Sequence, residues 1–139
     1  MLIAVDPGDT SGICIFNDDS SVKKMMQLNL EEFTKWAATY DGPVDTIVYE
    51  KFIVFRQKAH TQVGSTMKVS QAVGMLKMMA HSTGAKLVEQ GPDIKKIAIK
   101  WSGIIMPSQH SQTHKWDAFL HGYYYLVKEG KIKHDLEGF

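Results

Sequence analysis

Short apolar runs separated by turn residues dominate the first part of the chain, a pattern typical of strands. Residues 2–5 and 13–16 are continuous apolar runs, and the turn-forming sequence at 6–8 lies between them, which predicts a hairpin. Residues 22–28 predict a third strand after a polar turn rich in Asp and Ser. We therefore expect the first three strands to pair in antiparallel order.

Apolar residues follow helical spacing after this region. Asn29 and Glu32 form the pattern of a capping box, which predicts a helix over residues 30–40. Further strands are predicted at 46–49 and 86–89, and further helices at 67–82, after Pro92 and at 114–128. This order predicts an α/β protein with a mixed five-stranded sheet flanked by helices.

Length and composition fit one globular domain over residues 1–139, with a loose tail from about 129 to 139. The single cysteine, Cys14, excludes an intramolecular disulfide and fits a reducing compartment. The chain shows neither the pattern of a signal peptide nor a run of about 18 apolar residues. We therefore expect no membrane association and a place in the cytoplasm, of a bacterium or of an infected host cell.

Charge is unevenly distributed, although the net formal charge is only +1. Residues 1–50 hold three lysines and nine acidic residues, whereas residues 51–115 hold ten basic and two acidic residues. This asymmetry indicates either a polyanion-binding surface beside a cation site or lysines that solvate outer helix faces. Only Arg56 among the 16 basic residues is arginine, the residue best suited to reading guanine. A bound nucleic acid would therefore be recognised more by its backbone or shape than by its base sequence.

Three acidic residues stand where the predicted fold would bring them together. Asp6 and Glu50 each end an apolar strand, the position at which α/β sheets form ligand sites. Asp117 lies in the first turn of the last helix, on one face with His114 and His121. Clustered carboxylates repel one another unless a cation neutralises them, and oxygen ligands suit Mg²⁺ or Mn²⁺. Two such ions would support hydrolysis of a phosphodiester bond.

Each of these residues also has a structural interpretation. Asp6 would be a turn residue, Glu50 an exposed acid paired with a lysine, and Asp117 a partner of the helix dipole. His114 would cap its helix, and His121 is interpreted as a packed or exposed histidine rather than a ligand. The order along the chain, from strand-Asp through strand-Glu and a basic region to helix-Asp, favours a shared site. No P-loop sequence is present, which excludes that class of phosphate-binding enzyme.

Four motifs occur in a fixed order along the chain. They are Ile3-Ala4-Val5-Asp6-Pro7-Gly8 with Ser11-Gly12, Val48-Tyr49-Glu50 followed by Phe52, Gln71-Ala72-Val73-Gly74, and His114-Lys115-Trp116-Asp117-Ala118. In this order they resemble the RuvC-type Holliday junction resolvases, a branch of the ribonuclease H-like superfamily, in a compact form similar to those of viruses. The turn after Asp6 is one residue shorter than is usual in that family, and the aromatic after Glu50 is offset.

The resemblance implies a ribonuclease H-like fold and an endonuclease that cuts four-way DNA junctions as a homodimer, by paired symmetric nicks. It implies two Mg²⁺ or Mn²⁺ ions per active site, held by Asp6, Glu50 and Asp117. His114 would be a further ligand or a proton-handling group. The implied DNA-binding residues are Lys51, Phe52, Phe55, Arg56, Lys58, Lys95, Lys96 and Lys100. Phe52 or Phe55 would stack on an unpaired base, and the methionine-rich helix at 67–80 is the expected dimer surface.

Two other functions stay open. The same acidic residues would serve another ribonuclease H-like nuclease acting on RNA–DNA hybrids or flaps, although the motif at 71–74 and the helix at 67–80 favour the resolvase. The second alternative is a non-catalytic protein that binds junctions, against which the presence of all three carboxylates argues.

Overall fold

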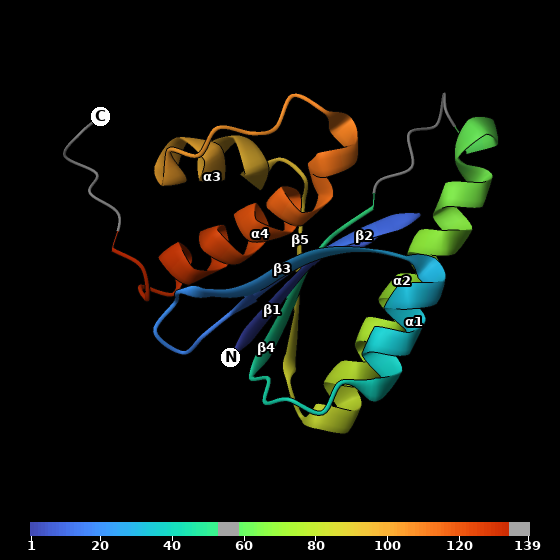
Figure 1. The fold of residues 1–139 in the computed structure, drawn as a ribbon, viewed down its shortest axis with the longest axis horizontal. Helices are drawn as coiled ribbons and strands as arrows, with labels where there is room; N and C mark the ends of the chain where they lie inside the picture. The colour runs from blue at the N-terminus through green and yellow to red at the C-terminus, as the bar shows by residue number, and fades with distance from the viewer. Residues whose placement is uncertain (53–58, 134–139) are drawn as a thin grey trace.

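A mixed five-stranded sheet lies at the centre of the protein (Figure 1). The structure is a computed structural model that describes residues 1–52 and 59–133. The elements along the chain are β1 (Leu2–Asp6), β2 (Thr10–Phe16), β3 (Val22–Asn29), α1 (Leu30–Thr39), β4 (Thr46–Glu50), α2 (Ala59–Thr83), β5 (Lys86–Gln90), α3 (Ile94–Ser102), η2 (His110–Gln112) and α4 (His114–Lys128). The strands lie in the order β3-β2-β1-β4-β5. β1, β2 and β3 pair antiparallel, whereas β1, β4 and β5 run parallel. The predicted fold class is confirmed.

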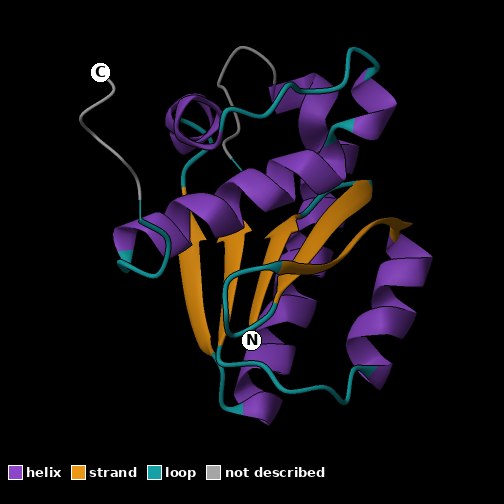
Figure 2. Ribbon diagram, turned by 60° about the vertical axis from the view of Figure 1, so that its left-hand side comes forward, coloured by secondary structure: helices purple, strands orange, loops and turns teal. Residues whose placement is uncertain are grey.

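Helices cover both faces of the sheet (Figures 1 and 2). α1 and α2 pack on one face, and α4 packs on the other, with α3 against α4. Ile3 and Val5 belong to the core on the α2 side, whereas Leu2 and Ala4 belong to the core on the α4 side. Because both faces are covered, the inner strands are apolar throughout rather than alternating.

Local signals set the start of α1, whereas α2 begins earlier than its sequence predicts. The Asn29 side chain accepts a hydrogen bond from the Glu32 backbone at 2.8 Å, and the Glu32 side chain accepts one from Asn29 at 3.0 Å. This confirms the predicted capping box. Apolar periodicity predicts that α2 starts at Met67, but the helix already starts at Ala59. The prediction misses the first turns because they lack the apolar stripe on which it depends.

The part of the chain after α4 is held against the protein. The backbone N–H groups of Lys131 and Ile132 donate to the Leu126 carbonyl at 2.9 and 3.3 Å. Ile132 packs against the core on the α4 side. Residues 131 and 132, within the expected tail, therefore contact the domain, and residues 134–139 lie outside the described part of the chain. No helix among the described residues is long and apolar enough to cross a membrane.

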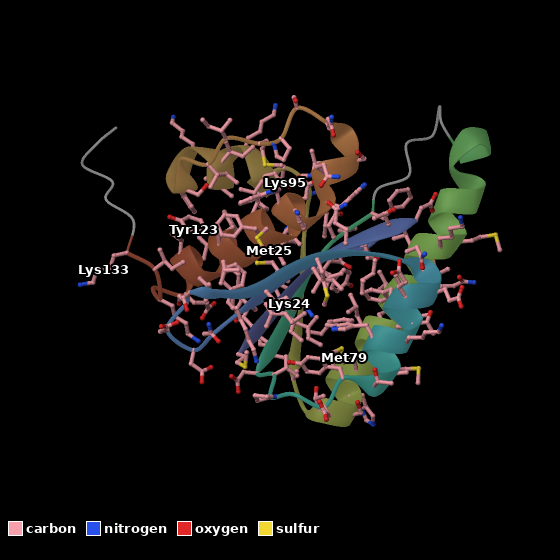
Figure 3. All side chains as sticks on the ribbon, viewed as in Figure 1. Lys24, Met25, Met79, Lys95, Tyr123 and Lys133 are labelled. Carbon is pink, nitrogen blue, oxygen red and sulfur yellow. The ribbon has the colours of Figure 1, made fainter. Side chains whose placement is uncertain are left out.

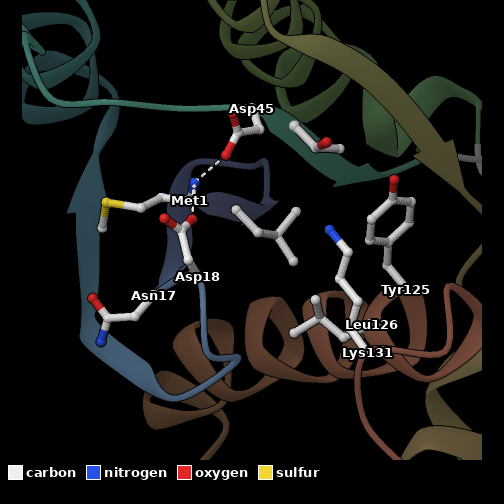
Figure 4. Close-up of a pocket in the computed structure, with 9 residues that line it drawn as sticks. Met1, Asn17, Asp18, Asp45, Tyr125, Leu126 and Lys131 are labelled. Atoms are coloured by element: carbon white, nitrogen blue, oxygen red, sulfur yellow. Dashed lines mark hydrogen bonds and ion pairs between the residues drawn. The ribbon is translucent and has the colours of Figure 1, made fainter.

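Polar contacts tie the start of β1 to the start of β4. The amine of Met1 forms ion pairs with Asp18 and Asp45 beside a hollow of about 230 Å³ (Figure 4). The Asp45 backbone N–H donates to the Met1 carbonyl at 2.8 Å. These contacts hold the two parallel strands in register, so that their opposite ends are also aligned.

The first turn of α4 lies in direct contact with β2 because residue 12 is glycine. A Cβ atom at Gly12 would lie 1.8 Å from the backbone oxygen of His114. The neighbouring strand adds a second tether, because the Gln27 side chain donates to the Ser111 carbonyl at 2.8 Å and accepts from the Lys115 backbone at 3.2 Å. These contacts position the helix end that carries His114 and Asp117.

We expect the substitution Gly12→Ala to destabilise the protein by at least the ~1–3 kcal/mol typical of overpacking, because the obstructing atoms are backbone. Urea unfolding of the purified protein measures the change. The matched control is Gly74→Ala in α2, where no described atom beyond the neighbouring backbone lies within 4 Å of the new Cβ. Removing a glycine from a helix should stabilise the control by up to about 1 kcal/mol. An unchanged unfolding midpoint for Gly12→Ala would contradict the close contact.

Candidate active site

The carboxyl ends of β1 and β4 bring two acidic residues to one edge of the sheet. The strands are parallel neighbours, and Val5 of β1 pairs with Tyr49 of β4. Each strand ends one residue later, β1 at Asp6 and β4 at Glu50. Both side chains are largely buried, with 14% of Asp6 and 12% of Glu50 exposed.

The first turn of α4 completes the group. His114 Nδ1 lies 3.6 Å from Asp6 Oδ2. Asp117, three residues later, interacts electrostatically with both Asp6 and Glu50. The structure therefore brings together the four residues that the sequence predicts as catalytic and metal-binding, Asp6, Glu50, His114 and Asp117.

Lys95 enters this acidic group from α3, where the sequence predicts only a DNA-binding role. Its Nζ lies 2.9 Å from Glu50 Oε1 and 4.0 Å from Asp117 Oδ1. Figure 3 shows Lys95 on the side of the sheet opposite Met79 of α2. With 27% of its side chain exposed, Lys95 is partly accessible to a ligand. Its ammonium group offsets part of the negative charge of the cluster.

The carboxylates of the cluster differ in their affinity for protons. Burial, followed by the nearby Glu50 and Asp117 carboxylates, raises the pKa of Asp6 well above its ordinary value. Burial would raise the pKa of Glu50 as well, but contacts with His121, Asp6 and Lys95 hold it well below its ordinary value. Burial also raises the pKa of Asp117, and Lys95 partly opposes this effect. The pKa values of the neighbouring Asp6 and Glu50 are therefore shifted in opposite directions.

The chemistry of the donor set fits a hard divalent cation. Three carboxylates and one imidazole supply oxygen ligands with a single nitrogen, and their mutual repulsion favours a bound cation. Across residues 1–52 and 59–133, no three His, Cys, Asp or Glu side chains are arranged so that they could hold a metal ion as they stand. Lys95 Nζ lies 2.9 Å from Glu50 Oε1, so a cation bound through that oxygen would have to displace the ammonium group.

A hollow of about 390 Å³ opens beside the acidic group, and Phe52 lies on its wall. It is lined by Asp6, Pro7, Gly8, Asp9, Thr10, Phe52, Val69 and His114. Among the other predicted DNA-binding residues, Lys51 pairs with Glu89 at 3.9 Å. Lys96 and Lys100 are exposed on α3. The predictions for Phe55, Arg56 and Lys58 fall outside the described residues.

Two residues of the site were missed as functional by sequence reasoning. His121 is fully buried, and its Nε2 lies 3.7 Å from Glu50 Oε1. Gln90 contacts the His121 ring from the end of β5. Signals for both were present, because His121 lies four residues after Asp117 and Gln90 ends a parallel strand as Asp6 and Glu50 do.

Comparison with known proteins identifies the fold. No protein-family model and no curated protein matches the sequence. The structure of Thermus thermophilus RuvC with a Holliday junction substrate matches with a TM-score of 0.64 and 15% identity, over 96% of this chain and 98% of that chain. A second T. thermophilus RuvC structure gives a TM-score of 0.56 and 13% identity, over 96% and 99%. The yeast mitochondrial Holliday junction resolvase Ydc2 gives 0.56 and 11%, over 94% and 79%. The chain therefore has the fold of the RuvC-type Holliday junction resolvases, as the order of its motifs predicts.

Proposed function

We propose that this protein is a metal-dependent endonuclease that resolves four-way DNA junctions by paired symmetric nicks. The observation that carries the proposal is the convergence of Asp6, Glu50, His114 and Asp117 at one edge of a RuvC-type sheet. One matching structure is a RuvC bound to a Holliday junction substrate, which supports branched DNA as the ligand.

In the proposed reaction Asp6, Glu50 and Asp117 would hold two Mg²⁺ or Mn²⁺ ions, which would supply an activated water and stabilise the leaving oxygen of the phosphodiester. His114, 3.6 Å from Asp6, is placed to orient that carboxylate and to accept or donate a proton at its ring. Lys95 neutralises negative charge at the same place, and its partly exposed ammonium is placed to contact a phosphate oxygen.

Residues around the acidic group supply the proposed DNA surface. Lys96 and Lys100 are exposed on α3, the helix that also carries Lys95. Phe52 lines the hollow beside Asp6 and is placed to stack on an unpaired base, an interaction of about 1–3 kcal/mol per base. Lys51 belongs to the same proposed surface. DNA contacts of Phe55, Arg56 and Lys58 are proposed from the sequence alone, because these residues lie outside the described part of the chain.

The methionine-rich side of α2 is the proposed homodimer surface. Met67 and Met78 are 60% and 74% exposed, although the opposite side of the helix is buried against the sheet. A hollow of about 520 Å³ lies between α1 and α2, lined by Thr34, Ala37, Ala38, Met75, Met78, Met79 and Ser82. A second copy of the chain on this surface would give two active sites for two equivalent strands.

We expect Asp6→Asn to abolish junction cleavage while junction binding is kept or strengthened, because the change removes a metal ligand and negative charge. The cleavage rate should fall by more than the about 10–100-fold that is typical when a residue that only orients a metal ligand is replaced. Cleavage of an end-labelled four-way junction in Mg²⁺ measures it, and EDTA should abolish the activity of the wild type.

The matched control is Asp9→Asn, which makes the same change in the same hollow at a residue paired with Lys68. Asp9→Asn should still cut. Cleavage of an RNA–DNA hybrid by the wild type would instead indicate another ribonuclease H-like nuclease. Junction binding without cleavage, in Mg²⁺ and in Mn²⁺, would indicate a binding protein.

The double substitution Lys96→Ala, Lys100→Ala should weaken junction binding and reduce its salt dependence. If each lysine neutralises one phosphate, the slope of log K against log salt concentration should fall by about 1.8. Fluorescence anisotropy in the Asp6→Asn background measures binding without cutting. Lys35→Ala on α1, on the other side of the sheet, is the control and should keep the slope of the wild type. An unchanged slope for the double variant would show that Lys96 and Lys100 do not contact phosphates.

We expect Met78→Glu to convert the dimer into monomers, because it places a charge in the proposed apolar interface. Sedimentation velocity at micromolar concentration measures the change. Ile105→Glu is the matched control, at a residue that is 94% exposed between α3 and α4. A wild type that sediments as a monomer, both with and without junction DNA, would rule out the dimer.

A further inference from the structure

His121 is a fully buried histidine on α4 that faces the acidic group from inside the protein. It lies one helical turn after Asp117 and has no exposed surface. Its Nε2 has no hydrogen-bond partner among the described residues, and the oxygen it faces is Glu50 Oε1 at 3.7 Å. A buried imidazole with an unpaired nitrogen is costly, so it indicates a role that simple packing does not explain.

Gln90 fixes the tautomer of the His121 ring. The Gln90 amide nitrogen lies 3.0 Å from the His121 carbonyl oxygen and 3.1 Å from His121 Nδ1. A carbonyl oxygen can only accept, so the atom facing it must be the amide NH₂ group, which donates. Its second hydrogen points to Nδ1, which must then carry a lone pair. The neutral ring therefore has its hydrogen on Nε2, the atom directed at Glu50.

Glu50 Oε1 has two neighbours that differ in how firmly they are held. Lys95 Nζ contacts it at 2.9 Å from a partly exposed, flexible side chain. His121 contacts it at 3.7 Å from a buried position in a helix, with its ring held by Gln90. A ligand phosphate can draw Lys95 away, whereas His121 stays in place. Both of these distances are to the same oxygen, Oε1.

We propose that His121 is a positioning residue for Glu50, and that Gln90 holds its ring so that the Nε2 hydrogen is presented to Oε1. A small rotation of the carboxylate shortens the 3.7 Å contact into a hydrogen bond. This fixes which Glu50 oxygen is directed toward the active site. The inference rests on the proposed nuclease function only for its catalytic consequence, because the tautomer and the contact belong to the chain alone.

The first test is spectroscopic and needs no activity. Nitrogen-15 spectra of the histidine rings in the full-length protein, with His121 assigned by its absence in His121→Gln, show which ring nitrogen carries hydrogen. We expect hydrogen on Nε2 and a bare Nδ1 in the wild type. The substitution Gln90→Leu should remove this preference and yield a mixture of the two tautomers. Hydrogen on Nδ1 of the wild-type ring would overturn the proposal.

The second test compares two replacements of His121 in junction cleavage. Gln places an N–H donor near the position of Nε2, whereas Leu fills the space without a donor. His121→Leu should lower the cleavage rate about 10–100-fold with junction affinity unchanged, as for other residues that orient a metal ligand. His121→Gln should recover most of that loss. Equal rates for the two variants would show that His121 only fills space.

Thermal unfolding of each variant separates misfolding from a positioning effect. If His121→Leu does not fold, the wild-type spectrum and the cleavage rate of Gln90→Leu, expected to fall about tenfold, decide the question. If the wild type cuts no branched DNA, the proposed function fails, and the spectra still test the His121 tautomer. If the wild type cuts and His121→Leu cuts equally well, the function stands and the positioning role fails.

Discussion

The contact between the first turn of α4 and the surface of β2 determines whether the acidic group can form. Gly12 lets the backbone of His114 approach the strand, and Gly12 itself pairs with Asp6 across the hairpin. The helix end that carries His114 and Asp117 is thereby placed over the end of β1. Gln27 adds hydrogen bonds to both sides of the same helix start. A rigid sheet edge and a helix fixed on it by close backbone contact are what bring residues more than 100 positions apart into one group.

Electrostatic repulsion is the main cost of that arrangement. Three carboxylates are placed in a largely buried region, where like charges interact strongly. In this structure the ammonium group of Lys95 offsets part of the repulsion, and the rest raises the pKa of Asp6. The same imbalance would favour a bound divalent cation, so the repulsion that costs stability in the protein without metal is also what the proposed chemistry depends on. A stable protein with an inactive site would be expected if the carboxylates were neutralised by substitution.

The site combines a fixed inner side with an adaptable outer side. On the inner side His121 and Gln90 are held within the packing of α4 and β5, and they face Glu50. On the outer side Lys95 is partly exposed, and Lys96 and Lys100 are exposed on α3. Such a division suits an enzyme for a large polyanion, because the reacting groups must be held accurately while the phosphate contacts must adjust to the path of the strand.

Local patterns in the sequence were sufficient to predict the strands, the capping box of α1 and the acidic residues at the strand ends. These features depend on neighbouring residues, so the apolar runs and the Asn29–Glu32 pair report them directly. The order of the motifs that contain Asp6, Glu50 and Asp117 was sufficient to predict the fold, which the matching structures confirm. The early start of α2 was not predictable, because its first turns carry no apolar stripe.

Only the tertiary structure decided the surroundings of the carboxylates. Lys95 looks like any surface lysine in the sequence, and its contact with Glu50 arises because α3 packs against α4. His121 looks like a packed histidine until β5 places Gln90 against its ring. The Gln27 contact with Lys115 joins residues 88 positions apart. Contacts of this kind depend on how whole elements dock, and the spacing of residues along the chain carries no information about that docking.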